Sequence, residues 1–134
     1  MTTETKTAPS YTVSRGSAPD RIEGRREFFD YTDLGAKAGS GGKMRAQIMK
    51  ARRGMVEDTG WHVHICEGQY IYLLGGWLDL QMVDGKTVRL EKGDSMYIPG
   101  GVPHNETGTS DDFELLEISI PADMGTEPCA KPDF

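Results

Sequence analysis

Residues 93–104, GDSMYIPGGVPH, place a strand between two turns and end on a histidine. The Gly-Asp pair at 93–94 predicts the first turn, and SMYIP (95–99) is rich in β-forming residues. The Pro-Gly-Gly sequence at 99–101 predicts a second, constrained turn. We therefore expect a short strand here, followed by a turn that directs His104 back toward an earlier part of the chain.

A second stretch, GWHVHICEGQYIYLLGGW at residues 60–77, places two histidines one residue apart. Side chains alternate faces on a strand, so His62 and His64 point the same way, roughly 7 Å apart. Two such imidazoles can bind one cation at about 2.1 Å per metal–nitrogen bond. After a turn at Glu67-Gly68, Gln69 begins the return strand and can present its amide oxygen to the same point.

The chain contains three histidines in total, and the third is His104. A single histidine is more often a structural residue than a ligand. Two histidines at a spacing of two, with a third behind a constrained turn, favour a metal site. The sequence predicts a mononuclear site formed by His62, His64, Gln69 and His104.

The rest of the chain indicates an all-β fold. From Met44 onward, about eight short apolar runs are separated by turn residues every 8–12 positions, and no helix of ten residues is predicted; this pattern is typical of a sandwich or barrel. At 134 residues the chain supports one compact domain. We expect a disordered or extended arm over residues 1–25, a barrel over 26–121 and an irregular tail over 122–134.

The charge distribution argues against a nucleic-acid surface. Residues 1–53 carry eleven Lys/Arg and six Asp/Glu, a net charge of +5, whereas residues 54–134 carry four and fifteen, a net charge of −11. Nucleic acids require a basic face, and the main body is acidic. No apolar run is long enough to span a membrane. Cys66 and Cys129 lack paired spacing and no secretory signal is present, so we expect a cytoplasmic protein.

Two motifs in residues 44–120 resemble those of the cupin superfamily. The second cupin motif, G-x5-P-x-G-x2-H-x3-N, is matched at its first four positions, with Gly108 at the closing Asn position. The first motif, G-x5-H-x-H-x3-4-E-x6-G, is matched at both histidines and the closing glycine, with Val56 at the opening Gly and Gln69 at the Glu. The matched residues are Gly93, Pro99, Gly101 and His104 in the second motif, and His62, His64 and Gly76 in the first.

The resemblance implies a double-stranded β-helix, or jelly-roll barrel, with a metal inside one mouth and usually a homodimer. Cupins include dioxygenases, isomerases and lyases as well as non-catalytic binding and sensor domains, so the fold leaves the function open. Imidazole ligands suit divalent Fe, Mn, Ni, Cu or Zn. With a neutral Gln69 the bound ion would keep its full +2 charge and act as a stronger Lewis acid. The alternative is that the Gln69 site has decayed.

Glu117 is the candidate general base. In the predicted strand FELLEISI (113–120), Leu115, Glu117 and Ser119 share one face. If that face points into the barrel, Glu117 is a carboxylate near a cation without an obvious partner. The alternative is a solvent-facing glutamate.

The predicted function is that of a small metal-dependent enzyme, a dioxygenase, isomerase or lyase, acting on a small oxygenated and anionic organic substrate. The alternative is a non-catalytic small-molecule-binding or sensor cupin. Tyr70, Tyr72 and Leu74 have the parity of an outward face, which predicts a homodimer interface. The aromatic segment REFFDYTDL (26–34) is expected either to cross to the partner subunit or to fold back on its own barrel.

Overall fold

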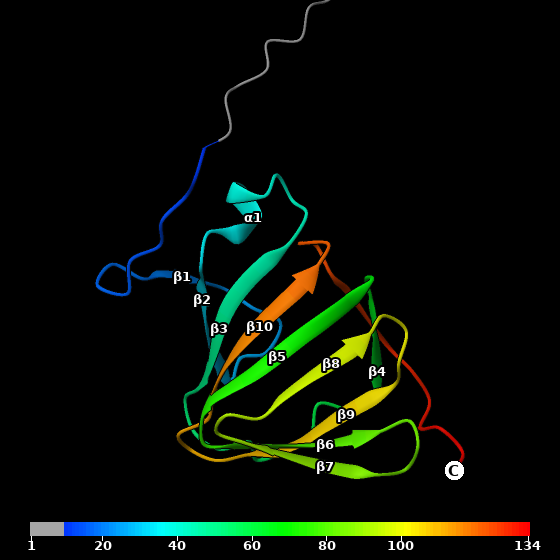
Figure 1. Cartoon of the computed structure of the whole chain (residues 1–134). Coiled ribbons are helices and arrows are strands. Elements are labelled where there is room, and N and C mark those ends of the chain that lie inside the picture. Colours follow the sequence, from blue (N-terminus) through cyan, green and yellow to red (C-terminus); the bar gives the residue numbers. More distant parts are fainter. Residues whose placement is uncertain (1–9) are drawn as a thin grey trace, which may run out of the picture.

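The computed structural model of the chain describes residues 10–134 and arranges them in two antiparallel β-sheets packed against each other (Figure 1). The expected all-β jelly-roll barrel is confirmed. The six-stranded sheet has the order β1 (Asp20–Ile22), β2 (Phe29–Asp33), β3 (Arg45–Ala51), β10 (Glu114–Ile120), β5 (Gly68–Gly75) and β8 (Ser95–Pro99). The five-stranded sheet has the order β11 (Gly125–Pro128), β4 (His62–Ile65), β9 (His104–Thr109), β6 (Trp77–Met82) and β7 (Thr87–Glu91).

Strand β10 shows how the alternating sequence pattern becomes two faces. It lies between β3 and β5, and Leu115, Glu117 and Ser119 are buried on its inner face. Leu116 and Ile118 lie on the outer face and are only partly buried. Of the two alternatives for Glu117, the interior face is therefore the observed one.

An apolar cluster fills the space between the two sheets. Burial of apolar surface, at about 25 cal/mol per Å², is the main stabilising contribution of such a cluster. Its buried members are Phe29, Tyr31, Met49, Ala51, Ile71, Leu73, Leu78, Leu80, Leu90, Ile98, Phe113 and Leu115.

The turn after β8 fixes the direction of β9. Gly101 has φ +81°, a left-handed conformation that favours glycine, and a Cβ on Gly100 would collide with the carbonyl oxygen of Cys66. The two glycine amides donate hydrogen bonds to the carbonyl oxygens of Glu67 and His64, both at 3.0 Å. The turn is thereby attached to the end of β4, so that His104 is held beside the first two histidines.

The aromatic segment at the N-terminus folds back on its own barrel. Strand β2 pairs with β3 of the same chain, and Phe29 and Tyr31 are buried in the core. Within the chain, residues 26–34 therefore take the fold-back alternative, because their apolar side chains find a core there. The segment between β2 and β3 contains one turn of helix, α1 (Ala36–Gly39).

The arm and the tail differ in part from the sequence expectation. Residues 1–9 of the arm lie outside the described residues; residues 10–25 are exposed, and they include β1, which pairs with β2. The tail is not irregular throughout, because Gly125–Pro128 form β11 against β4. Pro128 is tolerated there since β11 is an edge strand. No helix within residues 10–134 is both long and apolar enough to cross a membrane.

Candidate metal centre

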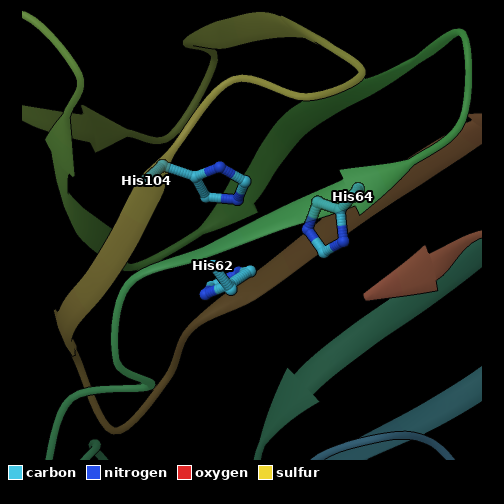
Figure 2. A group of neighbouring side chains, drawn as sticks. All are labelled: His62, His64 and His104. Atoms are coloured by element: carbon cyan, nitrogen blue, oxygen red, sulfur yellow. The ribbon is translucent and has the colours of Figure 1, made fainter. Parts of the chain in front are cut away.

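The three histidines of the chain lie together on the buried face of the five-stranded sheet (Figure 2). His62 and His104 are directly opposite each other on the antiparallel strands β4 and β9, and His64 follows His62 on the same face of β4. The ring centroids are 4.5 Å apart for His62 and His104, and 5.0 Å apart for each of the other two pairs. One potential ligand atom from each ring lies within 4.8 Å of those of the others, so the group could hold a metal ion.

The outer nitrogen of each imidazole is occupied by a hydrogen bond. Nδ1 of His62 lies 2.7 Å from the carbonyl oxygen of Gly60, and Nδ1 of His104 lies 2.9 Å from that of Val102. A carbonyl only accepts, so both rings carry their proton on Nδ1 and present a lone pair at Nε2. Nδ1 of His64 lies 3.0 Å from the Thr126 hydroxyl on β11. Partners of this kind commonly orient metal-binding histidines.

Burial keeps two of these imidazoles neutral. Desolvation lowers the pKa of His64 to about 3, with a smaller contribution from the charge of Arg25. Desolvation also lowers the pKa of His62, although the neighbouring Glu106 acts in the opposite direction. Near neutral pH both rings therefore have the unprotonated nitrogen that a metal ion requires.

Gln69 approaches from the opposite sheet. It lies on β5, where it pairs with Ser119 of β10 and Ile98 of β8, and its side chain is buried. Its Oε1 atom has no hydrogen-bond partner, and neither has Nε2 of any of the three histidines. The four atoms predicted from the sequence as ligands are thus all buried and all without a partner.

Glu106 is a further carboxylate at the histidine group that the sequence analysis missed. Its Oε2 lies 3.4 Å from Nε2 of His62, and its Oε1 lies 3.9 Å from Nε2 of His104. The hydroxyl of Thr59 donates a 2.6 Å hydrogen bond to Oε2. Burial raises the pKa of Glu106, but attraction to the protonated forms of His62 and His104 and the Thr59 hydrogen bond outweigh it, so the pKa is lowered.

The donor set fits a cation. Nε2 of His62 and of His104 presents a lone pair, and the nearest acidic atom is an oxygen of Glu106 that also carries lone pairs. These distances exceed those of a hydrogen bond, and no donor lies between the atoms. Lone pairs that face one another in a buried site repel unless a positive charge lies among them. A divalent ion supplies that charge, with imidazole nitrogens as its preferred ligands.

Glu117 lies inside the barrel, as predicted, but it has partners. Nε2 of Gln47 on β3 donates a 2.9 Å hydrogen bond to Oε1, and a guanidinium nitrogen of Arg45 lies 3.9 Å from the same oxygen. The expectation of a carboxylate without an obvious partner is therefore wrong. Burial nevertheless raises the pKa of Glu117, against the lowering effects of Arg25, Arg45 and Gln47.

A small cavity connects these groups. It is bounded by Gln69, Glu106 and Glu117 on one side and by core residues such as Phe113 and Leu80 on the other. The cavity has a volume of about 20 Å³, which is enough for one water molecule. Two carboxylates and an amide thus share one nearly closed space, where a proton could pass between them through a single water.

Replacing Glu117 by glutamine should stabilise the metal-free protein at neutral pH. The pKa of Glu117 is raised in the folded state, so its stabilising contribution is complete below the pKa of the unfolded chain and is lost as the pH rises through the folded-state value. Glu117→Gln removes the buried charge and can still accept from Gln47. We expect a gain of the order of 1 kcal/mol in the free energy of unfolding at pH 7 to 8, and none near about pH 4.

Urea unfolding of chelator-treated protein at the two pH values measures this difference. Glu114→Gln is the matched control, because Glu114 lies on the same strand and pairs with Lys50 at the surface. It should leave the stability within about 0.5 kcal/mol of the wild type at both pH values. A loss of stability in Glu117→Gln at neutral pH would mean that the pairing with Arg45 outweighs the burial of the charge.

Comparison with known proteins gives one matching family and several similar structures. The family model described as "Cupin domain" matches residues 55–120. KdgF from Halomonas sp. is 16% identical, with a TM-score of 0.68 over 85% of this chain and 96% of its own. The polyketide cyclase RemF from Streptomyces resistomycificus is 19% identical, with a TM-score of 0.71 over 90% of this chain and 87% of its own.

An RmlC-like cupin from Shewanella frigidimarina is 20% identical, with a TM-score of 0.62 over 84% of this chain and 93% of its own. No curated protein sequence matches the chain. At these levels of identity the structures share a fold with this chain, and their reactions are not thereby transferred to it.

Proposed function

The chain belongs to the cupin superfamily, and from this premise we propose that it is an enzyme holding one divalent transition metal through His62, His64, Gln69 and His104. One observation carries the proposal: all four of these ligand atoms are buried and without a hydrogen-bond partner, and the only other such side-chain atom within residues 10–134 is Nε of Arg45. Buried polar atoms without partners are rare in folded proteins and call for an explanation. A resident cation explains all four at once.

When bound, the ion would supply Lewis acidity toward a carbonyl or anionic oxygen and, if it is iron or another redox-active metal, the capacity to react with oxygen. The chain's own residues do the rest. The carbonyl oxygens of Gly60 and Val102 and the Thr126 hydroxyl hold the three imidazole rings in place. The ligands themselves are neutral, but Glu106 lies beside them, so the centre is less positive than an all-neutral environment would make it.

Two carboxylates are available for proton transfer. Glu117, with a raised pKa, is the proposed general base; Gln47 holds its Oε1 in a fixed position. Glu106 is the second candidate, because its Oε2 lies beside His62 and is oriented by Thr59. Both carboxylates line the same cavity as Gln69, an arrangement that suits reactions that remove a proton next to a carbonyl group.

The reaction class proposed is that of a dioxygenase, isomerase or lyase on a small oxygenated, anionic organic substrate. Protein purified without a histidine tag should carry about one equivalent of a transition metal or take it up on reconstitution. Bound iron together with oxygen consumption would support a dioxygenase, whereas Zn or Ni alone would support an isomerase or lyase. Less than about a tenth of an equivalent, with no uptake of Fe, Mn, Ni, Cu or Zn, would contradict the proposal.

The alternative, a non-catalytic small-molecule-binding cupin, is favoured by the size of the internal cavity. With about 20 Å³ for the centre of a water molecule, it holds no organic substrate, so any ligand must bind at the mouth. Solvent-exchange measurements separate the two functions. An enzyme should accelerate exchange of the α-protons of a bound carboxylic acid with deuterated water, whereas a binding protein should leave the rate unchanged.

We also propose that the protein is a homodimer that associates through the outer face of the six-stranded sheet. Tyr70, Tyr72 and Leu74 of β5 are each 37% exposed, and Tyr97 of β8, which pairs with Tyr70, is 56% exposed. Tyrosines are enriched at protein interfaces. With residues 26–34 packed on their own core, this face is the remaining support for the dimer.

Sedimentation velocity at micromolar concentration tests the dimer. The wild type should sediment as twice 14.8 kDa, and Tyr72→Glu should sediment as a monomer because the interface would bury an unpaired charge. Tyr11→Glu is the control, since Tyr11 lies on the exposed N-terminal arm. A 14.8 kDa species in the wild type, or a dimer that survives Tyr72→Glu, would contradict this interface.

A further inference from the structure

Two arginines at the edge of the histidine group are not paired with an acidic side chain. Arg25 and Arg26 lie in the loop between β1 and β2, and within residues 10–134 neither forms an ion pair. By contrast, Arg52 and Arg89 each lie within 2.8 Å of an aspartate oxygen. In a chain with a net charge of −6, unpaired guanidinium groups beside a buried site are available to an anion from outside.

Two clefts place Arg25 across the mouth of the site. One cleft, about 240 Å³ in volume, is lined by Arg25 and Arg26 together with His62 and Thr126. The other, also about 240 Å³, is lined by Arg25 together with Arg45 on the facing strand β3. Arg25 therefore lies between β3 on one side and the histidine strand β4 on the other, within reach of a small molecule bound at the histidines.

Arg45 contributes a second unused donor on the same cleft. Its Nε atom is buried and has no hydrogen-bond partner. A different guanidinium nitrogen of Arg45, Nη2, lies 3.9 Å from Oε1 of Glu117, and that oxygen already accepts from Gln47 at 2.9 Å. A buried guanidinium N–H without an acceptor costs free energy, which an incoming oxygen would recover.

We infer that Arg25 and Arg45 bind a carboxylate group of the substrate, while another oxygen of the same molecule reaches the histidine group. This inference rests on the proposed function and specifies its substrate as a small carboxylic acid with a second oxygen function. The planar guanidinium group pairs with a carboxylate through two parallel hydrogen bonds, which fixes orientation as well as charge.

Calorimetric titration of the metal-loaded protein with succinate and glutarate tests the inference. Succinamate and glutaramate keep one carboxylate for the metal and replace the other with a neutral amide of the same length. The wild type should bind each diacid about 10-fold or more tightly than its amide, the usual advantage of a charge-assisted pair. Arg25→Gln and Arg45→Gln should lose this preference at unchanged metal content. Arg53→Gln, an exposed arginine that lines neither cleft, should keep it.

The outcomes separate this inference from the proposed function. A wild type that binds metal but binds diacid and amide equally, or an Arg25→Gln variant that keeps the preference, would overturn the carboxylate site and leave the metal centre standing. Arg25-dependent binding of inorganic phosphate more tightly than either diacid would also overturn it. A chain that takes up no metal but still binds succinate through Arg25 would uphold the anion site and contradict the proposed function. Arg25 is exposed, so its variant tests binding without disturbing the core.

Discussion

Protein carrying His104→Ala is expected to bind its divalent ion at least about 100-fold more weakly than the wild type, because a ligand is lost outright and even outer-shell changes cost 10- to 100-fold. His104 is the one histidine of the three that comes from β9, so its removal leaves two histidines on a single strand, with Gln69 of β5 as the other proposed ligand. Competition with a chromophoric chelator at fixed pH, together with metal analysis, measures the affinity.

Thr126→Val provides the graded control for this loss. The threonine hydroxyl lies 3.0 Å from Nδ1 of His64, and valine keeps the shape of the side chain while removing the hydrogen bond. We expect a loss of affinity of about 10-fold, between the wild type and His104→Ala. Thermal unfolding of the metal-free proteins checks that both variants fold. If folded His104→Ala retains wild-type affinity, the histidine group is not the metal site.

The grouping of the three histidines was predictable because it depends on local geometry. Because side chains alternate along a strand, His62 and His64 share a face. The turn at 99–101 directs His104 back toward them, and both inferences depend on only a few residues of sequence. Gln69 follows from the same reasoning, since it begins the strand that leaves the β4 turn. The outward tyrosines of β5 were predictable for the same reason.

The residues that the sequence analysis missed depend on contacts between distant segments. Glu106 shares the inner face with His104 two residues earlier, so the alternation rule that paired the first two histidines could have identified it. No such rule could place Gln47, whose partner Glu117 is 70 residues away. The position of Arg25 depends on the pairing of β2 with β3 of the same chain. The contact of Thr126 with His64 depends on β11, an edge strand that is too short and polar to be recognised from the sequence.

Gln69→Glu should make the stability of the protein depend strongly on metal. It restores the carboxylate of the usual cupin motif, but it does so in a cavity that Glu106 and Glu117 already share. Without a cation, a third buried carboxylate should cost the metal-free variant about 3 kcal/mol of unfolding free energy, as other uncompensated buried charges do. With a divalent ion bound, the same charge becomes a ligand, and we expect the affinity to rise by about 10-fold or more.

Denaturant unfolding with and without saturating metal tests this dependence on metal. Gln81→Glu on the partly exposed strand β6 is the matched control, and its changes in unfolding free energy and in metal affinity should both be small.

The comparison also decides between a working and a decayed site. If Gln69 were a relic with no ion beside it, the glutamate would destabilise the variant equally under both conditions, since nothing would compensate its charge. A working centre instead gives a variant that is less stable than the wild type without metal and tighter-binding with it. A bound ion with one more anionic neighbour is a weaker Lewis acid. That loss of acidity would explain why the site has a neutral glutamine although a glutamate would bind the ion more tightly.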